Sequence, residues 1–237
     1  MAHFVILTGS ETKVFAWLDF QRLLEAHGHL SSVFSLDDVS WEAGFDIAVD
    51  ALMKKIEPAP PQTILIGHSI AGLVLPILGD RLEVASEIYI AAFTSKIGQS
   101  FLDRILLGEE IFDPIWSDGY RSLIRSKDPL TTHRHFLDNH LFHNCCTNAA
   151  DIYWKKSELP FEVIYGSSNL SEYRPRSRHY VVCTADRTIR VEWQRQAALL
   201  LPQPTVTEID SGHCPHISKP GELAKQVLMS VSNLVIE

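Results

Sequence analysis

Short apolar runs alternate with segments of helical periodicity along most of the chain. The apolar runs are rich in β-branched residues, which predicts strands at His3–Leu7, Leu30–Ser35, Thr63–Ile66, Glu87–Ala92, Tyr180–Thr184 and Thr205–Ile209. Between them, the spacing of apolar residues predicts helices over Val14–Ala26, Glu42–Ile56, Ile70–Leu82, Val191–Leu200 and Lys219–Val235. This alternation predicts an α/β fold with a mostly parallel central sheet and helices on both faces.

The segment from 95 to 178 breaks the alternation. It is long and aromatic, and it shows helical patches only around Phe101–Leu107 and Ala149–Trp154. An insertion at this point reaches the carboxyl ends of the strands, where open α/β sheets bind ligands. We therefore expect a core of residues 1–94 and 179–237 and an inserted lid over 95–178. A second small domain with no role in the site is the alternative.

The junction between the third strand and the third helix has an unusual composition. It contains the pattern G-x-S-x-A, with Gly67 and Ala71 two residues on either side of Ser69, and Gly72 follows. Small residues around a serine permit the sharp, strained turn that holds a nucleophilic hydroxyl clear of a sheet. An ordinary turn with an incidental serine is the alternative, but the strand before it and the helix after it favour a nucleophile.

A serine hydroxyl needs a histidine base, and the histidine needs a carboxylate to orient it. In sheets of this kind the chain order is serine, then acid, then histidine. His213 lies in a glycine-containing loop after the last strand, and Asp186 follows the strand before it. Asp210 is the rival acid, but it is close in sequence to His213. His216 is expected to have a packing role. The predicted triad is therefore Ser69, Asp186 and His213.

Composition and charge limit the classes of binding partner that are expected. The chain has 237 residues, 46% of them hydrophobic, with a net charge of −8. Without a long basic run, a nucleic-acid partner is not expected. No segment has the pattern of a signal peptide or the length of a transmembrane helix, so we expect a cytoplasmic protein without a membrane partner. A small-molecule substrate is the expected partner. The oligomeric state stays open, with a homodimer as one possibility.

Two clusters of side chains suggest other chemistry. Histidines gather beside Cys145 and Cys146, at positions 133, 135, 140 and 143. Their spacing matches no closed zinc pattern, so we expect no metal and no cofactor, and we favour histidines that pack near the substrate. Basic residues gather at Lys155, Lys156, Arg174, Arg176 and Arg178. They favour a solvated face over a site for an acidic or carrier-bound substrate.

Several stretches are similar to one branch of a known family. Residues 182–195 resemble the acid loop of the plant methylesterase and hydroxynitrile lyase branch of the α/β-hydrolases, and residues 211–223 resemble its histidine loop. Gly67-His68-Ser69 is similar to its elbow, and residues 142–145 are similar to part of its lid. The resemblance implies the α/β-hydrolase fold, with Ser69 as nucleophile, His213 as base and Asp186 as orienting acid.

The resemblance has two departures. The first strand of the family ends in His-Gly, and Thr8 stands here in place of the histidine, whereas Gly9 is retained. Charges at Glu11 and Lys13 replace small residues. An oxyanion hole made of backbone N–H groups can still form from Ser10 and Ile70. Cys214 stands where cyanohydrin cleavage uses a lysine, so hydroxynitrile lyase activity is not expected.

The function that follows is hydrolysis, through an acyl-enzyme, of an ester of a small, fairly apolar substrate. The residues expected to contact the substrate are Thr8, Gly9, His68, Trp116 and His143. Two alternatives remain. In the first, a lyase or cyclase of natural-product biosynthesis uses the triad for base-catalysed elimination, for example of acetate. In the second, the chain is a non-catalytic ligand receptor on the same scaffold.

Overall fold

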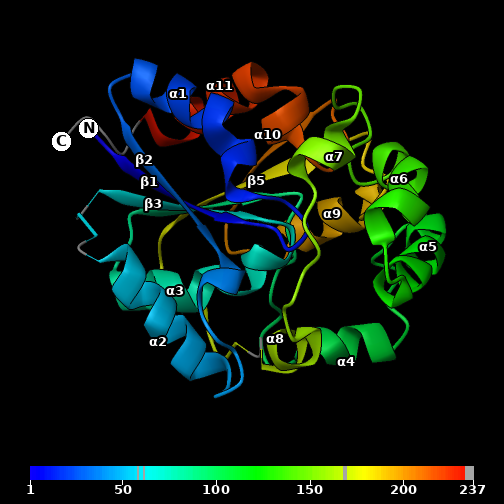
Figure 1. The fold of residues 1–237 in the computed structure, drawn as a ribbon. Helices are drawn as coiled ribbons and strands as arrows, with labels where there is room; N and C mark the ends of the chain where they lie inside the picture. Colours follow the sequence, from blue (N-terminus) through cyan, green and yellow to red (C-terminus); the bar gives the residue numbers. More distant parts are fainter. Residues whose placement is uncertain (58, 61, 168–169, 233–237) are drawn as a thin grey trace.

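The computed structural model describes residues 1–57, 59–60, 62–167 and 170–232, and within them a single sheet of six strands forms the centre of the protein (Figure 1). The strands are β1 (His3–Thr8), β2 (Leu30–Ser35), β3 (Thr63–His68), β4 (Ser86–Ile90), β5 (Ser177–Cys183) and β6 (Thr205–Ile209). Their order is β2-β1-β3-β4-β5-β6, and all the pairings between described strands are parallel. The predicted α/β-hydrolase fold is confirmed, and its sheet is wholly parallel.

The helices fall close to the predicted positions in the core of the fold. The α-helices of the described residues are α1 (Leu18–Ala26), α2 (Phe45–Ile56), α3 (Leu75–Leu82), α4 (Phe101–Leu106), α5 (Pro114–Arg125), α6 (Pro129–Asn139), α7 (Ala149–Tyr153), α8 (Phe161–Ser167), α9 (Val191–Ala198), α10 (Pro215–Ser218) and α11 (Pro220–Val231). Short 3-10 helices are η1 (Val14–Trp17), η2 (Leu36–Asp38) and η3 (Ser69–Leu73). The last predicted helix extends to Val235, and residues 233–235 lie outside the described residues. Within the described residues, no helix is both long enough and apolar enough to cross a membrane.

Both faces of the sheet are covered by helices, as Figure 1 shows. Helices α1 and α11 pack on one face around Phe20 and Leu223, and α2, α3 and α9 pack on the other around Leu52, Leu75 and Trp193. Strands β3 and β4 are buried along their whole length, whereas the edge strands β2 and β6 are partly exposed. A parallel sheet is buried on both faces, which explains the continuous apolar runs of its central strands.

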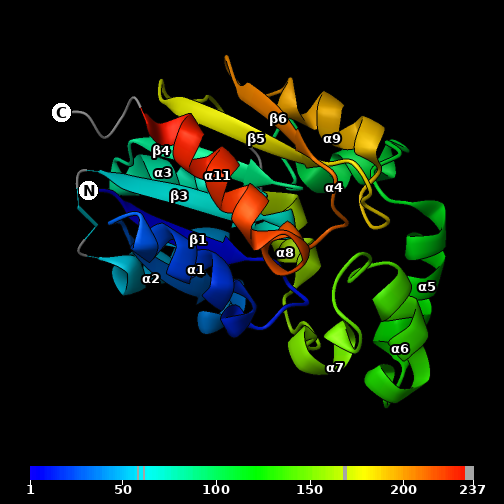
Figure 2. The same ribbon diagram turned by 90° about the horizontal axis from the view of Figure 1, so that it is seen from above.

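Between β4 and β5 the chain forms α4 to α8, which divide into two groups. Helices α5, α6 and α7 surround a separate apolar cluster that contains Trp116, Leu137 and Phe142, and they lie beyond the carboxyl ends of the strands (Figure 2). Helices α4 and α8 instead pack into the main core through Phe101 and Ile164. The sequence pattern missed α5, α6 and α8. In α5 and α6 the reason is that few of their residues are buried, which leaves only a narrow apolar stripe.

The topology fixes where a ligand can bind. The chain runs from β1 outward to β2 and then returns to β3 on the other side of β1. The carboxyl ends of β1 and β3, at Thr8 and His68, therefore flank the point where the strand order reverses. Open parallel sheets bind ligands in the crevice at this point.

Candidate active site

Ser69 lies at the apex of the sharp turn after β3. Its φ angle is 56°, in the left-handed region that a residue other than glycine rarely adopts. A Cβ on Gly67 would lie 2.7 Å from a methyl carbon of Leu75, and a Cβ on Gly72 would lie 2.2 Å from the carbonyl oxygen of Phe93. The position in this turn that has no room for a side chain is therefore 72, where the chain passes against the backbone of Phe93, and the second glycine of the motif stands there.

His213 and Asp186 are directly bonded. Nδ1 of His213 lies 2.8 Å from Oδ2 of Asp186, and both side chains are buried. Oδ1 of Asp186 accepts bonds from the backbone N–H groups of Thr188 and Ile189, at 2.7 and 3.1 Å. Since donors surround this carboxylate, Nδ1 of His213 carries a proton and Nε2 presents its lone pair. The rival Asp210 is exposed and pairs with Lys219.

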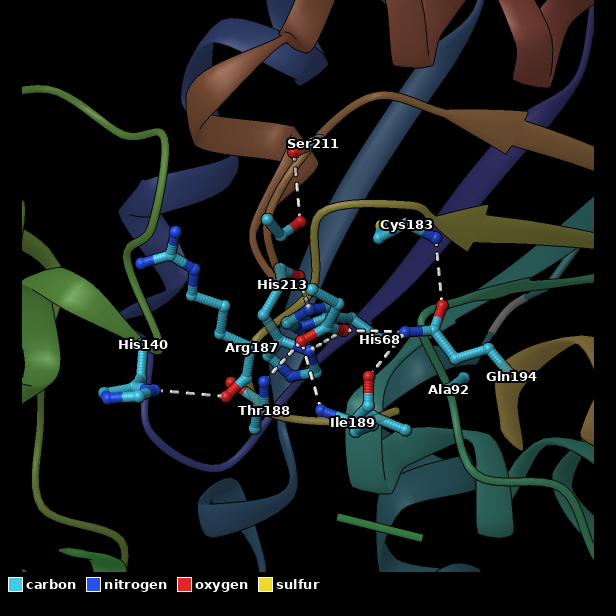
Figure 3. A network of polar contacts seen from close by, with 12 residues as sticks. His68, Ala92, His140, Cys183, Arg187, Thr188, Ile189, Gln194, Ser211 and His213 are labelled. Carbon is cyan, nitrogen blue, oxygen red and sulfur yellow. Dashed lines mark hydrogen bonds and ion pairs between the residues drawn. The ribbon is translucent and has the colours of Figure 1, made fainter. Parts of the chain in front are cut away.

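Gln194 on α9 completes the surroundings of Asp186, and sequence reasoning assigned it no role. Its Nε2 donates to Oδ2 of Asp186 at 2.8 Å and to the carbonyl oxygen of Ile189 at 3.2 Å. Its Oε1 accepts from the backbone N–H of Cys183 at 2.9 Å, so the side chain spans from the end of β5 to the acid (Figure 3). The sequence signal that could have identified it is its place on the predicted helix, three and four residues before Ala197 and Ala198, which puts a glutamine on an apolar helix face.

Ser69 and His213 line the same cavity, which has a volume of about 330 Å³. The residues with predicted roles that line it are Gly9, Ser10, His68, Ser69, Ile70, Trp116 and His213. Thr8 and His143, predicted as substrate contacts, are not among its lining residues. Thr8 is buried, and its Oγ1 lies 2.8 Å from Oγ1 of Thr12. The backbone carbonyl of His143 packs so tightly on residue 212 that only glycine fits there.

His68 lines the cavity and also bonds the loop that carries the base. Its Nε2–H donates to the carbonyl oxygen of His213 at 2.7 Å, which holds the histidine loop against the elbow. Burial, together with the neighbouring His213, lowers the pKa of His68 to about 3, so the ring stays neutral at physiological pH. His216 is fully buried and stacks on Trp17 with ring centres 3.9 Å apart, in agreement with the expected packing role.

The loop after β1 lies directly against Ser69. A Cβ on Gly9 would lie 3.1 Å from Cβ of Ser69 and 2.9 Å from Nδ1 of His68. Two backbone hydrogen bonds hold the loop against the chain at the end of α7. The N–H of Lys13 donates to the carbonyl of Tyr153 at 2.9 Å, and the N–H of Lys155 donates to the carbonyl of Glu11 at 3.1 Å. Within the loop, the hydroxyls of Thr8 and Thr12 are hydrogen-bonded to each other, and Thr8 is the position at which the sequence departs from the family that it resembles.

Glu11 brings a carboxyl group into the cavity. Its Oε1 accepts a bond from the hydroxyl of Tyr120 on α5 at 2.9 Å. Burial raises the pKa of Glu11 to about 7, although hydrogen bonds from Tyr120 and Ser10 oppose the rise. The sequence shows the charge but not its location, because Tyr120 is 109 residues away along the chain.

Neither of the two clusters with other suggested chemistry lines this cavity. Arg176 and Arg178 are buried at the amino ends of β4 and β5, where both pair with Glu87, and Arg176 also pairs with Asp80. The favoured interpretation as a solvated face is therefore wrong for Arg176 and Arg178, because their side chains are buried and paired with carboxylates of the chain itself. Among the described residues, no three histidine, cysteine or carboxylate side chains are grouped so that they could hold a metal ion.

Known proteins resemble the chain over almost its whole length. A model of the alpha/beta hydrolase family matches residues 9–226. Methylesterase 9 of Arabidopsis thaliana is 25% identical, over 96% of this chain and 97% of its own length. The structure of polyneuridine aldehyde esterase superposes with a TM-score of 0.75 at 19% identity and covers 98% of this chain and 99% of the other. A pyrethroid hydrolase solved with a compound abbreviated BIF has a TM-score of 0.77 at 20% identity and covers 100% and 99%.

Proposed function

The chain belongs to the alpha/beta hydrolase family, and we propose that it is an esterase that uses Ser69 as nucleophile, His213 as base and Asp186 as orienting acid. The observation that carries this proposal is the 2.8 Å bond between His213 and Asp186 at a cavity that Ser69 also lines. The names of the similar proteins, two esterases and a hydrolase, support ester cleavage.

The proposed reaction has two halves. Nε2 of His213 takes the proton of Ser69 as its oxygen attacks the ester carbonyl, and the backbone N–H groups of Ser10 and Ile70 bind the oxyanion. His213 then gives the proton to the leaving alcohol, and an acyl-enzyme remains on Ser69. Water, activated by His213, releases the acid. Asp186 keeps the ring oriented and stabilises its cation.

The size and walls of the cavity support a small ester with fairly apolar parts as the substrate. Its volume of about 330 Å³ lies near the lower end of the range for ligand pockets, roughly 300–1,000 Å³. Phe93, Phe112 and Leu141 form apolar parts of its wall.

A trapping experiment tests the nucleophile. A fluorophosphonate probe should label the wild-type protein and the control Ser122→Ala, whose serine lies exposed on α5, but not Ser69→Ala. Hydrolysis of small methyl esters should fall by about 10³-fold or more in Ser69→Ala and stay unchanged in the control.

The fate of oxygen distinguishes the competing reactions. In heavy-oxygen water, hydrolysis places one solvent oxygen in the released acid. An acid without solvent oxygen, accompanied by an unsaturated product, would replace hydrolysis by elimination. The alternative function, a non-catalytic ligand receptor, would be favoured by two results together. The wild type would hydrolyse no ester, and Ser69→Ala would keep ligand binding and biological effect.

A further inference from the structure

Glu11 is a carboxyl group without a cationic partner at the wall of the catalytic cavity. Among the ion pairs of the described residues, none includes Glu11, and its hydrogen-bond partners, the hydroxyls of Tyr120 and Ser10, are neutral. The titratable groups that act on it electrostatically are His213, which the proposed reaction uses, and Asp37, which is itself paired with Lys155. Arg121 also lines the cavity, but it is largely exposed and pairs with Asp118. The carboxylate form is therefore left without a compensating charge inside the protein, which is costly unless a ligand supplies one.

Aromatic rings continue the wall beside this carboxyl. Trp116, Tyr120, Phe161 and Tyr165 all line the cavity and contact one another in series. Their ring centres are 5.3 Å apart for Trp116 and Tyr120, 6.5 Å for Tyr120 and Phe161, and 5.7 Å for Phe161 and Tyr165. Aromatic rings attract a cation through their negative faces, and they attract a neutral alkyl group of the same shape less strongly.

Glu11 is also held in place. Its backbone carbonyl accepts a bond from the Lys155 N–H, and its carboxyl group accepts a bond from Tyr120 on α5, so both the main chain and the side chain of Glu11 are held before a ligand arrives. Preorganised groups bind a ligand with a smaller entropy loss than mobile ones.

We propose that the cavity selects esters that carry a compact ammonium group away from the reacting carbonyl, and that Glu11 and the adjacent rings bind this cation. The proposal rests on the esterase function proposed above, and it adds the class of substrate. A neutral hydroxyl or alkyl group at this position would engage either the carboxylate or the rings, whereas an ammonium group engages both.

Two esters of identical shape test the selection. The first is acetylcholine, and the second is its neutral isostere, in which carbon replaces the quaternary nitrogen. A second pair carries the charge in the acyl part, as the methyl ester of a trimethylammonio acid and its tert-butyl analogue. In at least one pair, the wild type should show a kcat/KM for the cationic ester that is higher by about tenfold or more. Glu11→Gln should lose this preference, and the control Glu25→Gln, which removes an exposed carboxylate from α1, should keep it.

A binding measurement separates this proposal from the esterase proposal. Phenyltrimethylammonium and tert-butylbenzene are titrated against Ser69→Ala with and without Glu11→Gln. Tighter binding of the cation that depends on Glu11 supports the cation site even if no ester is hydrolysed, in which case the esterase proposal alone fails. Equal binding and equal turnover of the charged and neutral compounds overturns the cation site and leaves the esterase in place.

Discussion

Replacing Gln194 by leucine should destabilise the protein and slow catalysis together. The side chain is fully buried and makes three hydrogen bonds, to Asp186, Ile189 and the N–H of Cys183. Leucine has a similar volume but leaves the Cys183 N–H and one acceptor site of Asp186 without a partner. Each unsatisfied buried group costs about 1–3 kcal/mol, so with two such groups we expect the free energy of unfolding to fall by about 2–6 kcal/mol.

The catalytic effect should be on kcat. With one of its orienting bonds lost, Asp186 holds His213 less accurately, and a displacement of this kind costs up to about 100-fold in rate. KM should change little because Gln194 does not line the cavity. Urea unfolding and ester hydrolysis measure the two effects, and Gln196→Leu, at an exposed position of the same helix, is the matched control.

A glutamate at position 194 gives a sharper readout. It keeps an acceptor for the Cys183 N–H but replaces the donor with a second carboxyl group beside Asp186. Relative to wild type, its activity should be lowest at high pH and should recover as the introduced carboxyl group is protonated. If Gln194→Leu unfolds at the urea concentration of the wild type and retains its kcat, Gln194 does not position the acid.

Three further predictions concern other parts of the site. Since burial raises the pKa of Glu11 from 4.5 to about 7, the stability of the wild type is highest below pH 4.5 and falls as the pH rises through 7. Glu11→Gln should therefore be more stable than wild type by about 3 kcal/mol above pH 7 and equal to it below 4.5, and a stability difference that stays constant in thermal melts at several pH values would refute this. Gly72→Ala places a Cβ 2.2 Å from a backbone oxygen and should lower the free energy of unfolding by about 2 kcal/mol or more. Gly221→Ala, with open space around the new Cβ, should be neutral or stabilising, and similar melting temperatures for the two variants would contradict the packing argument. His68→Phe removes the donor to the His213 carbonyl and should lower kcat by about tenfold, whereas His68→Gln keeps an N–H group and should lose less. Equal activity of both variants and wild type in steady-state assays would exclude a supporting role for His68.

The sequence by itself was sufficient for the fold class, the strands and most helices around the sheet, and it showed which residues follow the strand ends. Apolar runs separated by helical periods encode a parallel sheet, and the carboxyl ends of parallel strands meet at one edge. Residues that follow different strands, such as Ser69 and His213, can therefore be assigned to one site without coordinates. The assignment of catalytic roles to them stays a prediction.

Tertiary structure alone decided the pairings between side chains that are distant in sequence. Glu11 meets Tyr120 only because α5 stands over the loop after β1, and Arg178 meets Glu87 only because β4 and β5 are neighbours. Gln194 and Asp186 are close in sequence, eight residues apart, yet they meet only because α9 packs against β5. A local pattern records which side of an element is buried. The depth and angle at which two elements pack, and so which polar groups meet between them, depend on the whole core, and no local pattern contains them.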